Sequence, residues 1–253
     1  MTEATAATIP SLAMTLRSLM RADLTVLARS RQTVILNLAV PLVIVAVTSR
    51  GNLGRGAGFV VGLAITYGLL SSALMGYSAM VARDRELGVF DGLRVTPTPP
   101  WAIMLSRLVV QLAANLVTSI VVMAVGSLIL HVRFGAVEYL LMVAISVLGA
   151  AMFLSIGQAL AGLVRSAAAV SAVSRVAYAV LLLVGLLGLT GALGDGFERF
   201  ADWTPVGALI NLFAAALSLA PWSRVDTYAI VASVGYIVVF GVVGIRWFRW
   251  TAQ

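Results

Sequence analysis

Six long, continuous apolar stretches run through this chain of 253 residues and leave few ways for it to fold. A helix needs about 20 mostly apolar residues to cross a bilayer, and backbone groups in lipid must be hydrogen-bonded within their own segment. The stretches do not alternate residue by residue, as the strands of a β-barrel do. The sequence therefore predicts an all-α polytopic membrane protein with six spans, at residues 33–49, 57–80, 106–130, 139–163, 174–193 and 228–246.

Composition agrees with lipid as the solvent and excludes several kinds of chemistry. Charged residues make up 11% of the chain, against about 25% in a typical soluble domain. The chain has no cysteine and a single histidine, His131, which excludes thiol chemistry and any site that needs two histidines. It also has no lysine, so it cannot contain a P-loop, whose lysine contacts the nucleotide phosphates. If ATP drives this protein, another chain binds it.

The arginines predict the orientation in the membrane. All 17 basic residues are arginine, and the formal net charge is +7. They lie in short segments between apolar runs, which argues against a nucleic-acid surface. With six spans, twelve arginines fall on the side of the two termini and five on the other side. Since cytoplasmic loops are enriched in arginine and lysine, we expect both termini to be cytoplasmic.

Two cytoplasmic segments are amphipathic rather than spanning. Residues 11–29, within the N-terminal segment 1–32, place leucines on one helical face and arginines on the other, which is typical of a helix in the headgroup plane. Asp23 falls within the apolar face, where an arginine at the membrane edge could pair with it. The second segment, 83–94, opens the loop 83–100 and places Leu87, Val89, Phe90 and Leu93 on one broad face.

The segment 194–227, on the opposite side, is too long for a turn and too interrupted for a span. It contains an apolar stretch of about 14 residues, Val206–Leu219, between Pro205 and Pro221. That length suits a re-entrant or interfacial helix. Trp203 and Trp222 would anchor it at headgroup level.

Residues 85–97 read Arg-Glu-Leu-Gly-Val-Phe-Asp-Gly-Leu-Arg-Val-Thr-Pro. This run resembles the cytoplasmic loop between spans two and three of ABC type-2 permeases, where the pattern is roughly R-E-x-G-[T/V]-[L/F]-[D/E]-x-L-x-x-[T/S]-P. The basic pair before the span with Pro41, and Trp203-Thr204-Pro205-Val206 before the last span, are also similar to that family. The resemblance covers essentially the whole chain and is closest to the drug- and antibiotic-exporting branch.

The resemblance implies a transport subunit with no catalytic residues of its own, in a bacterial plasma membrane. Loop 83–100 would dock on a separate ABC ATPase, present in two copies, which would hold ATP and Mg²⁺. A second permease, identical or paralogous, would complete the assembly. The chain departs from the family at Thr98-Pro99-Pro100 and at Ser106-Arg107, where basic residues and Gly-Lys are common. The residues expected to couple to the ATPase are Arg85, Glu86, Gly88, Phe90, Asp91, Leu93, Thr96 and Pro97.

Other polar and small residues have two interpretations. Arg85 and Glu86 could simply form an exposed ion pair worth at most about 1 kcal/mol. Gly68, Ser72 and Gly76 repeat every four residues in span two and allow close approach of another helix. They could line a dimer face or a transport path, although ordinary packing within the chain is favoured. Gln111 and Asn115 in span three could face a transport path, but interhelical hydrogen bonding is favoured.

Two other functions remain as alternatives. A stand-alone secondary transporter would need a coupling-ion site, often in paired repeats, and no convincing inverted repeat is present. An intramembrane enzyme would need clustered acidic, histidine or serine side chains, whereas the acidic residues here lie in loops. An ABC exporter permease that moves a hydrophobic or amphipathic substrate, such as an antibiotic, drug or lipid-like molecule, is the favoured interpretation.

Overall fold

A computed structural model describes residues 12–29, 31–48, 56–90, 100–217 and 222–247, and within these ranges the chain is helical and has no strand. This confirms the predicted all-α polytopic fold class. The described elements are α1 (Leu12–Arg29), α2 (Arg31–Thr48), α3 (Ala57–Ser71), the π-helical turn η1 (Ser72–Tyr77), α4 (Ser78–Glu86), α6 (Pro100–Ile129), α7 (Ala136–Leu163), α8 (Ala167–Thr190), α9 (Asp195–Trp203), α10 (Pro205–Leu217) and α11 (Arg224–Arg246).

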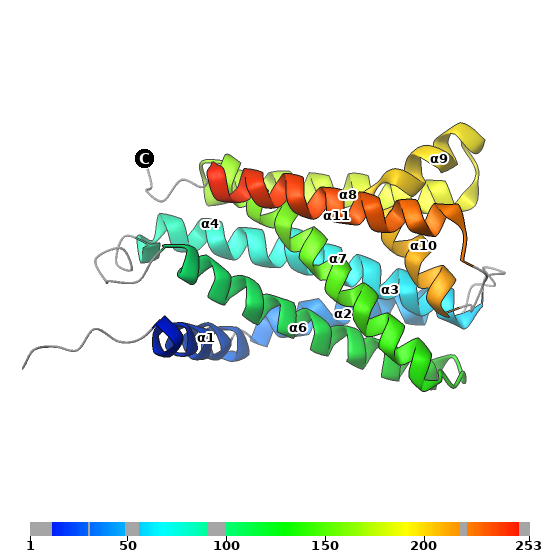
Figure 1. Cartoon of the computed structure of the whole chain (residues 1–253), viewed down its shortest axis with the longest axis horizontal. Helices are drawn as coiled ribbons and strands as arrows, with labels where there is room; N and C mark the ends of the chain where they lie inside the picture. Colours follow the sequence, from blue (N-terminus) through cyan, green and yellow to red (C-terminus); the bar gives the residue numbers. More distant parts are fainter. Residues whose placement is uncertain (1–11, 30, 49–55, 91–99, 218–221, 248–253) are drawn as a thin grey trace, which may run out of the picture.

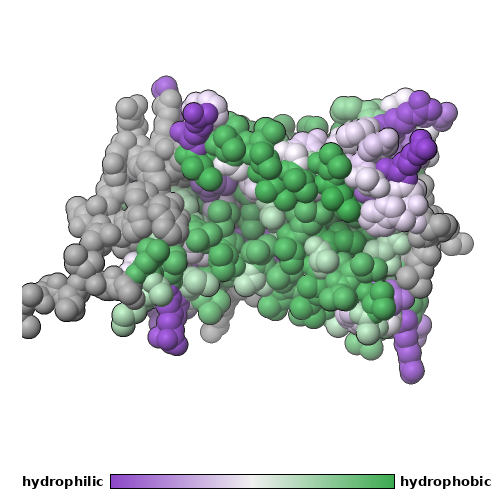
Figure 2. Space-filling view, in the orientation of Figure 1, coloured by the Kyte–Doolittle hydropathy of each residue, from purple (hydrophilic) through white to green (hydrophobic). Residues whose placement is uncertain are grey.

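Among the described residues, five helices are long and apolar enough to cross a membrane, or six if the bent pair Asp195–Trp203 and Pro205–Leu217 is counted as one span. One is the continuous helix Ala57–Glu86 formed by α3, η1 and α4, called span two below; the others are α6, α7, α8 and α11. They correspond to the last five predicted spans. The first predicted span, 33–49, coincides with α2, whose described apolar part, Asn37–Thr48, is shorter than a full span. Figure 2 shows an apolar band around the middle of the molecule, with polar residues toward both ends.

Several helices extend beyond the apolar runs that predict them. Span two continues to Glu86 rather than ending near residue 80, and α8 begins at Ala167 rather than 174. Each added residue of a helix gains a backbone hydrogen bond once the helix is formed, so the helix continues into the polar layer, where hydropathy gives no signal. The predicted separate helix over 83–94 is consequently divided, because residues 83–86 belong to α4.

Span two is the centre of the bundle. The most apolar part of this helix is 89% buried, against 17% for α8 and α11. Between residues 58 and 78 every residue is buried except Met75 and Gly76, which both lie in η1. Helix α7 approaches closely, since a Cβ atom on Gly157 would lie 2.7 Å from the carbonyl oxygen of Ala73. The outer helices are therefore available to lipid or to other subunits.

The helices define two ends of the bundle (Figure 1). At the end called the α4 end, α1 lies beside the start of α6, α4 finishes, α7 connects to α8, and α11 finishes. At the opposite end, called the α9 end, α9 and α10 lie between the end of α8 and the start of α11. This arrangement puts the described parts of the segments predicted to be cytoplasmic together at the α4 end.

Helices α9 and α10 form the element expected from residues 194–227. They are bent by 90° at Thr204, whose backbone N–H and hydroxyl both donate to the carbonyl of Ala201. The Thr204 hydroxyl also accepts from the N–H of Gly207 at 3.2 Å, and Pro205 starts α10, as N-caps and N1 prolines commonly do. Because α8 ends and α11 begins at the same end of the bundle (Figure 1), the pair has the geometry of a re-entrant segment.

Candidate functional site at the end of span two

Arg85 is buried between the end of α4 and the end of α7, and 2% of it is exposed. One guanidinium nitrogen, Nη1, donates to the carbonyl of Ala161 at 2.8 Å. The other, Nη2, donates to the carbonyls of Val164 at 2.7 Å and Arg165 at 2.8 Å. The last carbonyls of a helix lack partners within it and carry partial negative charge. Arg85 therefore ties span two to the connection between α7 and α8.

Glu86, the next residue, binds the start of α8. Its Oε1 accepts a hydrogen bond from the N–H of Ala167 at 2.6 Å, and Ser166 caps the same helix through a 3.2 Å bond from the N–H of Ala169. A carboxylate is favourable at a helix N-terminus, where amides lack partners. Two adjacent residues thus hold the end of one helix and the beginning of the next.

Gly88 ends the helix that carries this pair. Its φ of 70° lies in the left-handed region, which glycine adopts without the steric cost of a Cβ atom. The N–H of Leu87 donates to the carbonyl of Arg83 at 2.9 Å, and that of Gly88 to the carbonyl of Arg85 at 3.1 Å. A glycine just beyond a helix terminates it in this way.

The apolar face predicted for residues 83–94 is divided, because some of its side chains lie in the protein interior and others at the surface. Phe90 is fully buried, and the guanidinium carbon of Arg107 lies 4.8 Å from its ring centroid, a cation–π distance. Leu87 is 72% exposed and Val89 38% exposed. Leu87 therefore projects outward from a helix end that the bonds of Arg85 and Glu86 fix. Four further predicted coupling residues lie outside the described residues: Asp91, Leu93, Thr96 and Pro97.

A charged cluster beside this segment joins three helices. Arg107 of α6 is 8% exposed and donates through Nη1 to a carboxylate oxygen of Asp84 in α4. Its Nε lies 3.9 Å from a carboxylate oxygen of Asp23 in α1. The hydroxyl of Ser106 donates to the other oxygen of Asp23. The acidic residue on the apolar face of α1 therefore does pair at the membrane edge, and the pairing holds α1 against α6.

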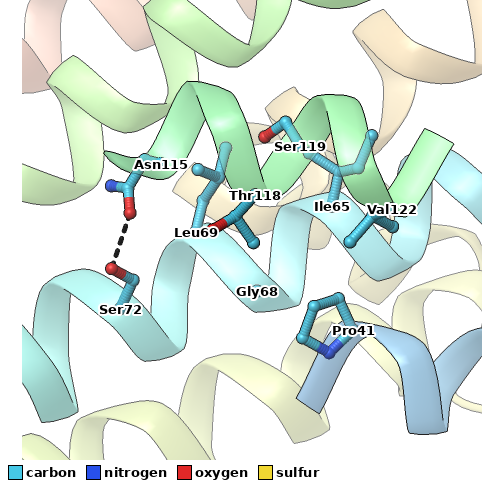
Figure 3. A pocket seen from close by; sticks show the side chains of 9 residues that line it. All are labelled: Pro41, Ile65, Gly68, Leu69, Ser72, Asn115, Thr118, Ser119 and Val122. Carbon is cyan, nitrogen blue, oxygen red and sulfur yellow. Dashed lines mark hydrogen bonds between the residues drawn. The ribbon is translucent and has the colours of Figure 1, made fainter. Parts of the chain in front are cut away.

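Deeper in the bundle, three predicted polar residues lie together, and Figure 3 draws two of them, Ser72 and Asn115. The hydroxyl of Ser72 donates to Oδ1 of Asn115 at 2.6 Å and accepts from Nε2 of Gln111 at 2.9 Å. All three side chains are buried, and the bonds join span two to α6. Within the described part of the chain, Nδ2 of Asn115 has no hydrogen-bond partner.

A cavity of about 10 Å³ adjoins this group and is partly lined by Pro41 and Gly68, which is near the lower limit for one water molecule. A Cβ atom on Gly68 would lie 3.1 Å from Cγ of Pro41, so Gly68 is where α2 approaches span two. Gly76 differs, because among the described residues the one atom within 4 Å of a Cβ there is Oδ1 of Asn37, at 3.8 Å. The structure thus places Gly68 and Ser72 in contacts within the chain and Gly76 beside open space.

Sequence reasoning did not identify Arg107 and Asp84 as parts of the site. The available signal was their position, since each is a charged residue at the edge of an apolar run, where pairing is expected. What it could not give was the partner, because Asp23, Asp84 and Arg107 are far apart in the sequence and meet only in the folded chain.

The fold and this site define a polytopic helical membrane protein whose charged residues fix helix ends and interhelical contacts. Within the described residues, no group of three or more His, Cys, Asp or Glu side chains could hold a metal ion. A family model described as "ABC-2 family transporter protein" matches residues 3–246. The chain belongs to the ABC-2 transporter family and is a membrane component of a transport system. A search of curated proteins finds no match.

Proposed function

We propose that this chain is the membrane-spanning permease subunit of an ABC exporter, with the α4 end of the bundle in the cytosol. Two separate ATPase subunits bind ATP and Mg²⁺ and dock at this end. A second permease, identical or paralogous, pairs with this one in the bacterial plasma membrane. The chain supplies the passage for a hydrophobic or amphipathic substrate, such as an antibiotic, a drug or a lipid-like molecule.

The observation that carries the proposal is the attachment of the last residues of α4 to two other helices. Arg85 binds carbonyls at the end of α7, and Glu86 binds the first amide of α8. A force applied at the exposed Leu87 would therefore move span two, α7 and α8 together. Since span two is the most buried helix of the bundle, displacement of its end would be transmitted to the membrane interior.

Charge supports the proposed orientation. The elements at the α4 end carry most of the described arginines, and the α9 end carries Arg133, Arg199 and Arg224. Cytosolic segments of membrane proteins show this enrichment. Cytosolic placement would also put the α4 end on the side where ATP is available.

The test is co-purification of the detergent-solubilised chain with the ATPase encoded by a neighbouring gene, followed by an ATP hydrolysis assay. Leu87→Asp replaces an exposed apolar side chain that makes no internal bond, so the fold should persist. Burial of one leucine contributes about 2 kcal/mol, so we expect association and hydrolysis to fall at least about tenfold. The matched control is Leu193→Asp, because Leu193 is 57% exposed at the α9 end, and it should leave both unchanged.

A stand-alone secondary transporter is the alternative, and the same preparation distinguishes it. Transport by the purified chain in proteoliposomes, driven by a proton gradient without any ATPase, would refute the exporter proposal. Equal ATPase association by the Leu87 and Leu193 variants would refute the proposed docking site.

A further inference from the structure

A pocket of about 400 Å³ lies toward the α4 end, between α1, α2, span two and α6. This volume is within the usual range of about 300–1,000 Å³ for small-molecule sites. Its lining includes Val26 of α1, Asn37 and Val40 of α2, Met75 and Arg83 of span two, and Gln111 of α6. Four separate elements thus contribute to one cavity.

The π-helical turn η1 explains why the central helix has an exposed side there. A π-turn inserts an extra residue into the helical repeat and changes the direction of the side chains that follow; such turns are frequent at functional sites. Met75 and Gly76, the two residues of 58–78 that are not buried, both lie in this turn and both line the pocket. Met75 is 40% exposed. The π-turn therefore places the flexible side chain of Met75 and the small residue Gly76 at the wall of the cavity.

The lining is charged only at the Arg83 end, and along span two it is mainly apolar, with the neutral polar side chains of Asn37, Gln111 and Ser71 among the apolar ones. Arg83, at the end nearest the membrane surface, is exposed, and no described acidic side chain lies within ion-pair distance of it. Asp84 also lines the pocket, but Arg107 already binds its carboxylate. From Arg83 to Ser71 the lining follows span two for about 18 Å at 1.5 Å per residue. Val40, Met75 and Met80 supply apolar surface along that distance, and methionine adapts to ligands of varied shape.

We infer that this pocket binds an amphiphile with an anionic head group, which Arg83 contacts, and one hydrocarbon chain, which lies along Met75, Met80 and Val40. Arginine pairs well with phosphate and carboxylate groups. Two sources share this chemistry: a phospholipid of the surrounding leaflet, and a single-chain anionic cargo. The inference deepens the proposed function by naming a ligand class, and it rests on that function only for the step from binding to transport.

The test measures binding to the full-length chain in detergent by native mass spectrometry. The probes are dioleoylphosphatidylglycerol, dodecyl phosphate, dioleoylphosphatidylcholine and glycerol 3-phosphate. Gly76→Leu should fill the pocket and lower the affinity for both anionic amphiphiles at least about tenfold, since several buried methylene contacts are lost. Arg83→Gln should lower the same affinities about tenfold, the effect of one charge-assisted hydrogen bond, and change phosphatidylcholine binding little.

The matched control is Gly235→Leu, because a Cβ atom on Gly235 has no neighbour within 4 Å and the residue lies on the exposed side of α11. Gly76→Ala, whose added carbon would make only an ordinary contact, gives a smaller loss and guards against misfolding of the leucine variant. Tighter binding of phosphatidylglycerol would indicate that the ligand is a phospholipid of the surrounding leaflet. Tighter binding of dodecyl phosphate would indicate that it is a single-chain cargo.

The inference is overturned if Gly76→Leu binds as much amphiphile as Gly235→Leu, or if glycerol 3-phosphate competes as well as the chain-bearing probes. Neither result depends on an ATPase. A failure of the exporter proposal would therefore leave this binding assay unaffected, and the two can be told apart.

Discussion

At the scale of single residues, Arg85 and Glu86 show how charged side chains can be used at a membrane surface. Each binds backbone groups that a helix end leaves without partners, carbonyls for Arg85 and an amide for Glu86. The sequence alone also allowed these two residues to form an exposed ion pair. It shows the two charges but not the backbone groups that they bind. Because Arg85 is buried, its hydrogen bonds replace lost contacts with water and contribute to the stability of the fold.

We predict that Arg85→Ala destabilises the protein by about 3 kcal/mol, because the buried carbonyl of Ala161 and the partly buried carbonyls of Val164 and Arg165 lose hydrogen bonds to a charged donor. The measurement is the thermal unfolding midpoint of the detergent-solubilised chain, which should fall by several degrees. Arg133→Ala provides the control, since Arg133 is exposed at the α9 end, and it should unfold near the wild-type temperature. Equal midpoints for the two variants would show that the Arg85 bonds are not stabilising.

At the scale of elements, apolar runs were sufficient to predict the spans, but the ends and irregularities of the helices were not predictable in this way. Lipid requires a continuous apolar helix, so α6, α7, α8 and α11 could be read from hydropathy. The π-turn at Ser72–Tyr77 and the extension of span two to Glu86 depend on packing and on backbone hydrogen bonds. For that reason, the amphipathic helix expected at 83–94 had the wrong start, and the pocket beside Met75 was not foreseen.

Helix α1 gives a prediction at this scale. It contains no buried residue, and Asp23 connects it to Ser106 and Arg107 of α6. Asp23→Ala should loosen α1, so amide hydrogen exchange across residues 12–29 should speed up about tenfold, the effect of roughly 1.4 kcal/mol of lost local stability.

Exchange in α7 should be unchanged in this variant, which serves as an internal reference. Asp195→Ala, in α9 at the other end of the bundle, is the matched substitution and should leave α1 as protected as in the wild type. If α1 exchanged at the wild-type rate in Asp23→Ala, the charged cluster would have no part in holding it.

At the scale of the whole molecule, the helices bring distant segments to two ends with different properties. The α4 end gathers α1, the residues around Arg85, the α7–α8 connection and the end of α11, whereas the α9 end carries the bent α9–α10 pair (Figure 1). The sequence could predict this grouping. The six predicted spans put two membrane crossings between one of these segments at the α4 end and the next. The contacts of Arg107 with Asp84 and Asp23 could not be predicted, because they depend on how helices distant in sequence pack together.

Photo-cross-linking from residue 87 tests most directly whether the α4 end is where an ATPase docks. The chain has no cysteine, so Leu87→Cys and Leu193→Cys each provide one labelling site for a benzophenone maleimide, in membranes that also contain the ATPase. The account predicts that illumination joins the ATPase to the label at residue 87 and not to the label at residue 193. Cross-linking from residue 193 alone, or labelling of residue 87 by an impermeant maleimide from outside intact cells, would contradict it.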